Sequence, residues 1–250
     1  MPEIKLSTAP LASLLLAVAS AVLAAESPAP YTLGPSSAAE QTPLVVELRR
    51  VEPQMGGPDR TVVEGSLSID RVTAYPLIPT ASAPILPKEV TLFVVKVDFT
   101  LSPLTGTKNC REMTLHLAVS HPDDAVDLFP RRIESPQDVP QSLSISPTQN
   151  LIGAHDSQGL FPVDALAPTI RGFSRQGHDL YWTFAPGEGS SISPGSRSVF
   201  FVLRTLKVRT QAPLAVDCEA KIGSYLFGRW WWPSPATSAA ARLVIPLRSS

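Results

Sequence analysis

The sequence contains two cysteines, Cys110 and Cys218, whose thiols could form a disulfide or act as nucleophiles. Cys218 lies in a run whose alternate residues are apolar, so its side chain should point into a core. Neither cysteine has a neighbouring His or a helix start that would lower the pKa of its thiol. In an oxidising compartment an even number of thiols usually pairs. We therefore expect a disulfide between Cys110 and Cys218, with two separate buried thiols as the alternative.

Three consecutive tryptophans, Trp230, Trp231 and Trp232, follow Arg229. In a strand, alternation would place Trp231 opposite the other two. An exposed indole is a natural platform for a sugar ring or a partner protein, and an arginine can stack on it. The alternative is that the indoles cap one end of the fold, because large aromatic side chains usually serve packing. These four residues form the candidate ligand-binding site.

Three histidines beside aspartates invite a metal interpretation: His121, His155 and His178. A zinc site requires three or four ligands, commonly at short regular spacings, and a calcium loop requires alternating oxygen ligands. Neither spacing occurs, and His and Asp after a strand are typical of a turn. The sequence also lacks glycine patterns for phosphate or dinucleotide binding. We therefore expect no metal site and no cofactor.

Residues 172–177 (GFSRQG) resemble a nucleophile elbow around Ser174, but the second glycine comes one residue too late and no helix is expected to follow. Ser174 could still meet His155 and Asp156 in a folded chain, which keeps a secreted hydrolase as an alternative. The sequence favours a protein that is not an enzyme.

The N-terminal residues 1–25 predict a secretory signal peptide, with Lys5 before an uncharged apolar run and small residues before Glu26. The apolar run is shorter than the roughly 20 residues of a membrane span. We therefore expect export to the extracellular space or periplasm, and no stable membrane insertion after cleavage. Residues 26–43, rich in Ser, Ala and Pro, predict a flexible leader.

The composition restricts the class of protein. The 250 residues include 26 Pro and 14 Gly, 44% hydrophobic residues and 17% charged residues, with 21 basic and 22 acidic side chains. Frequent proline is incompatible with a coiled coil or a long helical bundle. The hydrophobic content excludes a highly charged disordered chain, and the balanced charge argues against a nucleic-acid partner.

The elements expected to position these residues are strands. Apolar and polar residues alternate most clearly in Val90–Leu101, where Phe93, Val95, Val97, Phe99 and Leu101 share one face. In Thr61–Tyr75 the same alternation places Val63, Leu67 and Ile69 inward and Glu64 outward. Further strand-like runs occupy residues 44–50, 113–120, 179–184, 198–210, 214–222 and 241–247. Residues 123–129 and 163–167 could form single helical turns.

Strands without intervening helices predict an all-β fold, an antiparallel two-sheet β-sandwich, with an immunoglobulin-like topology as one form and long Pro-rich loops. Residues 44–250 fit a single domain; a split at the Pro/Ser/Gln-rich segment 134–150 is the alternative. The resulting hypothesis is an exported, non-enzymatic binding, adhesion or structural module with a protein or glycan partner. A carbohydrate-binding protein using Trp230–Trp232 and the secreted hydrolase are the alternatives.

Overall fold

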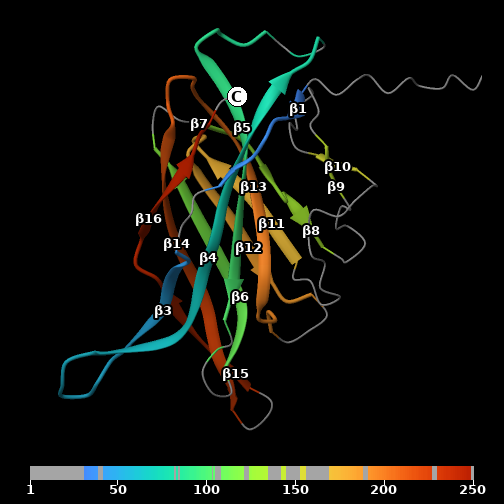
Figure 1. Cartoon of the computed structure of the whole chain (residues 1–250). Helices are drawn as coiled ribbons and strands as arrows, with labels where there is room; N and C mark the ends of the chain where they lie inside the picture. Colours follow the sequence, from blue (N-terminus) through green and yellow to red (C-terminus); the bar gives the residue numbers. More distant parts are fainter. Residues whose placement is uncertain are drawn as a thin grey trace, which may run out of the picture.

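A computed structural model of the chain describes residues 31–38, 42–81, 83, 85–102, 104, 108–120, 124–134, 142–144, 153–155, 169–187, 191–226 and 230–248. Over these ranges the ordered elements are strands, with no helix (Figure 1). In this described part, no helix is long and apolar enough to cross a bilayer.

The first half of the chain forms β1 (Tyr31–Leu33), β2 (Ser37–Ala38), β3 (Leu44–Glu52), β4 (Arg60–Pro79), β5 (Val90–Leu101), β6 (Asn109–Val119), β7 (Asp124–Phe129) and β8 (Arg132–Ile133). The second half forms β9 (Ser142–Ser144), β10 (Gly153–His155), β11 (Thr169–Arg175), β12 (Asp179–Ala185), β13 (Gly195–Leu206), β14 (Gln211–Leu226), β15 (Trp230–Thr237) and β16 (Ala241–Pro246).

Antiparallel pairing joins most of these strands into one 14-stranded sheet, ordered β7-β13-β5-β4-β3-β15-β14-β6-β12-β11-β8, with β1, β2 and β16 pairing beside this path. The sheet curls as a half-barrel, so that its two ends approach one another: the Ala125 amide, at the start of β7, donates to the Gly177 carbonyl after β11 at 2.6 Å. The prediction of an all-β antiparallel fold is confirmed. The two-sheet sandwich and its immunoglobulin-like form are not confirmed.

The main core fills the concave side of this sheet and consists of the alternate apolar residues that define its strands. Its largest fully buried side chains include Trp182, Phe93, Phe99, Phe184 and Phe201. A second, smaller cluster lies on the opposite face of β5 and β13, where Leu92, Val94, Phe200 and Val202 pack with Tyr31 of β1. β5 and β13 are therefore buried on both faces, which explains their nearly continuous apolar sequences.

Strands that precede residues 134–150 in the chain and strands that follow them belong to the same sheet, since β5 pairs with β13 and β6 pairs with both β12 and β14. In the segment predicted as a leader, β1 and β2 pair with β4, through Tyr31↔Pro79 and Ser37↔Ala74.

Residues 124–129, where a helical turn was one expectation, form strand β7 instead. β7 pairs with β13, and its Ala125, Leu128 and Phe129 are buried. Pairing with a central strand outweighs the weak local helical pattern, because burial of these side chains against β13 stabilises the extended form. The other expected helical turn, residues 163–167, lies outside the described residues.

Candidate functional site

Two long hairpins, β3–β4 and β14–β15, extend from the same end of the sheet (Figure 1). β15 runs antiparallel to β3 and meets it at Thr237↔Arg49. The residues that follow Arg49 in β3 and the residues that precede Thr237 in β15 therefore both lead toward the tips of their hairpins. At the β3–β4 tip, Met55 is fully exposed and Gly56 adopts a left-handed φ of +80°, which glycine tolerates at a turn.

The three tryptophans of the predicted ligand site are the first residues of β15, directly after the β14–β15 tip. Trp230, Trp231 and Trp232 pair with Leu226, Tyr225 and Ser224 respectively. Arg229 lies outside the described residues. The assignment of these four residues to a ligand site stays a prediction.

A β-bulge in β4 directs an acidic side chain into the protein beneath the two hairpins. Leu48 pairs with Gly65 while Arg49 pairs with Val63, so that Glu64 is the extra residue. The bulge interrupts the alternation, and Glu64 is buried while Val63 is 45% exposed. The expectation that Val63 faces inward and Glu64 outward is therefore wrong. A Cβ on the next residue, Gly65, would lie 2.5 Å from a methyl group of Leu104, which would have to move to make room for it.

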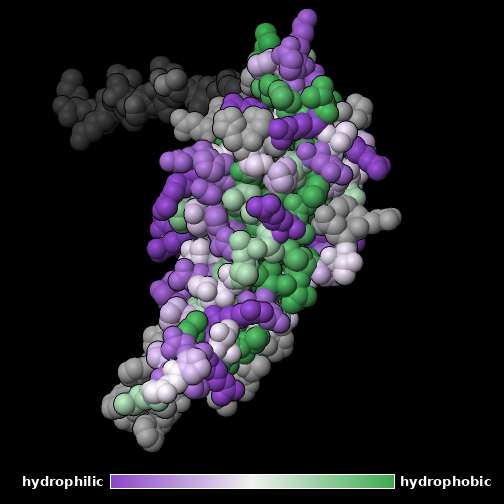
Figure 2. Space-filling view, turned by 90° about the vertical axis from the view of Figure 1, so that its left-hand side faces the viewer, coloured by the Kyte–Doolittle hydropathy of each residue, from purple (hydrophilic) through white to green (hydrophobic). Residues whose placement is uncertain are grey.

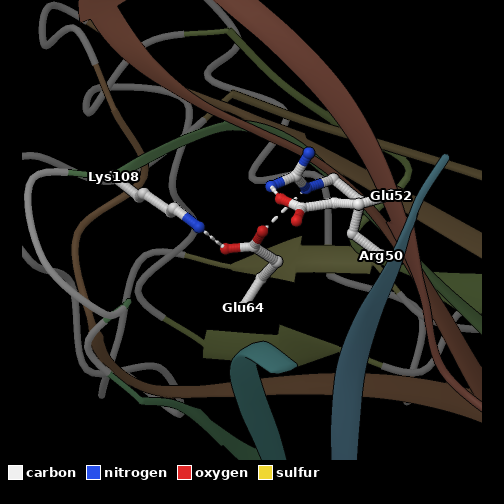
Figure 3. Close-up of polar contacts among 4 residues, drawn as sticks. All are labelled: Arg50, Glu52, Glu64 and Lys108. Carbon is white, nitrogen blue, oxygen red and sulfur yellow. Dashed lines mark hydrogen bonds and ion pairs between the residues drawn. The ribbon is translucent and has the colours of Figure 1, made fainter. Parts of the chain in front are cut away.

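Figure 3 shows the Glu64 carboxylate between two cations that come from different parts of the chain. Nε of Arg50, in β3, donates to Oε1 of Glu64 at 2.7 Å, and the Lys108 ammonium, just before β6, contacts Oε2. Glu52 pairs with the far side of the Arg50 guanidinium. A cavity of about 190 Å³ adjoins this cluster, lined by Arg50, Glu64, Lys108, Ile222, Gly223, Ser224 and Ser234.

Burial tends to raise the pKa of Glu64, but the hydrogen bonds from Lys108 and Arg50 outweigh it and hold the pKa below its ordinary value. The same bond with Glu64 raises the pKa of Arg50. A carboxylate with both oxygens occupied by cations is a poor proton acceptor. The cluster is therefore suited to fasten the root of the β3–β4 hairpin to the segment just before β6, and poorly suited to catalysis.

The two cysteines are free thiols, both buried, and the predicted disulfide is wrong. β6 and β14 are neighbours, but Cys110 pairs opposite Ile222 and Cys218 opposite Leu115. Four strand positions, about 13 Å, thus separate the two cysteines along β14. A disulfide usually requires Cα atoms within about 4.4–6.8 Å. Burial raises the pKa of the Cys110 thiol to about 11 and that of Cys218 further, so neither is a ready nucleophile.

An aromatic row on the outer face of β14, β6, β12 and β11 contains the one histidine that the sequence did not single out. His116 lies between two carboxylates, with Nδ1 2.8 Å from Asp217 and Nε2 3.1 Å from Asp179. Its ring stacks on Tyr181, which stacks in turn on Phe173. The cross-strand register explains this arrangement, since Asp217↔His116, His116↔Tyr181 and Tyr181↔Phe173 are direct pairs.

The other histidines are dispersed. His178 lies in the β11–β12 turn, His155 in β10, and His121 outside the described residues. No group of three or more metal-ligating residues occurs within the described ranges. Ser174 is an exposed residue of β11, and the chain continues through a tight turn with positive φ at Gln176 and Gly177 into β12. A nucleophile elbow requires a helix after the serine, and this segment has a strand.

A third hairpin stands apart from the large sheet. β9 and β10 pair only with each other in the described part of the chain, with Ser144↔Gly153, Leu143↔Ala154 and Ser142↔His155. They belong to the long connection between β8 and β11, residues 134–168.

The chain matches known proteins in structure but not in sequence. No protein-family model matches the chain, and no curated protein sequence matches it. The similar solved structures include the delta-toxin of Clostridium perfringens, with 10% identity, a TM-score of 0.42, and coverage of 82% of this chain and 93% of the toxin. A structure described as a pore-forming protein gives 7% identity, a TM-score of 0.43, and coverage of 84% and 94%. The NetB toxin of Clostridium perfringens in its membrane-inserted form gives 8% identity, a TM-score of 0.33, and coverage of 80% and 94%.

These neighbours overturn the function expected from the sequence. The predictions of a binding, adhesion or structural module, of a carbohydrate-binding protein and of a secreted hydrolase are wrong, because the matched structures are named as toxins and as a pore-forming protein. The expected protein or glycan partner without stable membrane insertion is likewise wrong, because one neighbour is described in a membrane-inserted form.

Proposed function

We propose that the protein is a membrane-acting pore former that inserts the β9–β10 hairpin and its flanking residues into a bilayer. The observation that carries this proposal is the separation of this hairpin from the 14-stranded sheet. It is a strand pair whose exit would break no strand pairing to that sheet in the described structure. The names of the structural neighbours agree with pore formation. Because their TM-scores are low, the proposal rests on the hairpin and not on these matches.

The sequence around the hairpin suits a bilayer. Residues 142–146 read Ser-Leu-Ser-Ile-Ser, an alternation of apolar and hydroxyl side chains, as in strands with one lipid-facing and one water-facing side. Residues 134–168 contain no Lys or Arg, the side chains that cost most on the lipid face of a membrane strand. Two membrane strands of about 9–11 residues each fit within this connection.

One hairpin alone cannot span a membrane. Its two outer edges would leave backbone N–H and C=O groups unpaired in hydrocarbon, at a cost of several kcal/mol per group. Hairpins from several copies must therefore pair side by side in a closed ring, with the hydroxyl side chains toward water. The proposed activity requires no catalytic site, and export to the extracellular space or periplasm is the location that suits it.

The tips of the β3–β4 and β14–β15 hairpins are the proposed contact with the membrane surface. Trp230–Trp232 at one tip and the exposed Met55 at the other suit the interface, where tryptophan is enriched.

Release of a trapped dye from phospholipid vesicles tests the proposal. The purified protein should release the dye, and Leu143→Asp should abolish release because it adds a charge to the lipid-facing side. Ser144→Asp, one residue away on the opposite face, is the matched control and should retain release. Equal release by both variants, or none by the unaltered protein, would contradict the proposal.

A further inference from the structure

β4 and β5 separate at the end of the sheet opposite the two long hairpins and leave an apolar groove between them. Their pairing extends to Pro76↔Phe93, and beyond Pro76 strand β4 pairs with β1, through Leu77↔Leu33 to Pro79↔Tyr31. A cavity of about 320 Å³ lies in this wedge. Leu77 and Leu92 form its walls, and Ala83 and Leu86 of the β4–β5 connection pack against the same second hydrophobic cluster.

The mouth of this groove combines exposed apolar surface with positive charge. Ile85, which lines the cavity, is fully exposed. Figure 2 shows hydrophobic residues exposed among hydrophilic ones at the upper end, where Figure 1 draws the β4–β5 connection. Lys88 and Lys207 also line the cavity. The Lys207 amide donates to the Glu89 carbonyl at 2.7 Å, which keeps the backbones that carry the two lysines together.

The two lysines at this mouth lie outside the ion pairs formed among the described residues, although Glu89 follows Lys88 in the sequence. No acidic residue lines the cavity among the described residues. Neither Lys88 nor Lys207 forms an ion pair with a described residue, whereas Lys221 pairs with Glu112 at 2.8 Å. An apolar cavity lined by two lysines that form no ion pair with a described residue is complementary to an apolar chain that ends in an anion.

We propose that this groove binds a free fatty acid, with the acyl chain in the cavity and the carboxylate between Lys88 and Lys207. At roughly 30 Å³ for each water-sized group, a cavity of about 320 Å³ corresponds to a chain of about ten carbons. The site is independent of membrane insertion, because it is formed by β4, β5, the connection between them and Lys207 just after β13, and uses no residue of the β9–β10 hairpin.

Titration calorimetry with decanoate, below the concentration at which it forms micelles, tests the proposal on the purified full chain. Decanoate should bind at one saturable site, and decanol should bind more weakly. The double variant Lys88→Gln/Lys207→Gln should weaken decanoate binding by about tenfold or more, because it removes the charge-assisted hydrogen bonds. Lys221→Gln, which removes a lysine outside the groove, is the matched control and should leave the affinity unchanged.

A second variant tests the cavity. Ala83→Trp should block decanoate binding by filling the groove, and dye release from vesicles should continue in both groove variants. The lysine variants alter exposed side chains, so their result stands even if Ala83→Trp fails to fold. The proposal is overturned if decanoate does not saturate, if decanol binds as tightly, or if the double lysine variant retains full affinity.

Discussion

Replacement of Glu64 by glutamine removes the negative charge that pairs with Arg50 and Lys108 at the root of the β3–β4 hairpin. Removing one partner from a buried ion pair costs about 3–5 kcal/mol in favourable cases. Here the Arg50 and Lys108 side chains are 24% and 28% exposed, and Arg50 keeps its pair with Glu52. Water and Glu52 therefore offset part of the loss, and we expect Glu64→Gln to lower the free energy of unfolding by about 2–3 kcal/mol at pH 7.

Urea denaturation at several pH values measures this effect. Because the pKa of Glu64 in the folded protein lies below its ordinary value of 4.5, its stabilisation is fully present above pH 4.5 and is lost as the pH falls through the folded pKa. The difference between the unaltered protein and Glu64→Gln should therefore be largest near neutral pH and shrink under acid conditions. Glu47→Gln is the control: its pair with Arg49 is exposed, at 45% and 57%, and should contribute under about 1 kcal/mol. A Glu64→Gln variant as stable as the Glu47→Gln variant, or a difference that does not change with pH, would refute the role of the cluster.

Two further predictions concern the thiols and the packing of β11. In the native protein at pH 8, Cys110 and Cys218 should resist alkylation, because both are buried and the pKa of Cys110 is raised to about 11; in urea both should be modified, and modification of neither would indicate a disulfide. Gly172→Ala should lower the unfolding free energy by about 1–3 kcal/mol, because a Cβ there would lie 2.4 Å from the Pro130 carbonyl oxygen. Gly57→Ala, whose Cβ would meet its nearest neighbour at 3.4 Å, is the control, and equal stability of the two variants would contradict the packing in this region.

The strands were readable from the sequence wherever apolar and polar residues alternate. The expected strand over residues 90–101 coincides with β5, and those over residues 113–120 and 241–247 differ from β6 and β16 by a few residues. Strand β15 was not predicted, because Pro233 and Pro235 interrupt its pattern. The structure accommodates both prolines because β15 meets β3 only at Thr237, so that most of its outer edge requires no N–H donor.

The arrangement of the strands in the sheet was harder to predict from the sequence. A bulge in β4 reverses the faces of Val63 and Glu64, and neither residue signals it. The placement of β15 between β3 and β14, and the curling of one sheet in place of two, depend on pairings between residues far apart in the chain. For the same reason Cys110 and Cys218 suggested a disulfide that their register on β6 and β14 does not allow.

Single-channel recording in a planar lipid bilayer tests most directly whether the β9–β10 hairpin lines a pore. The unaltered protein should produce discrete conductance steps. Ser144→Asp should shift the reversal potential in a salt gradient toward cation selectivity, because it adds a ring of carboxylates on the water-facing side of the pore. The absence of conductance steps, or an identical reversal potential for Ser144→Asp and the unaltered protein, would contradict the claim.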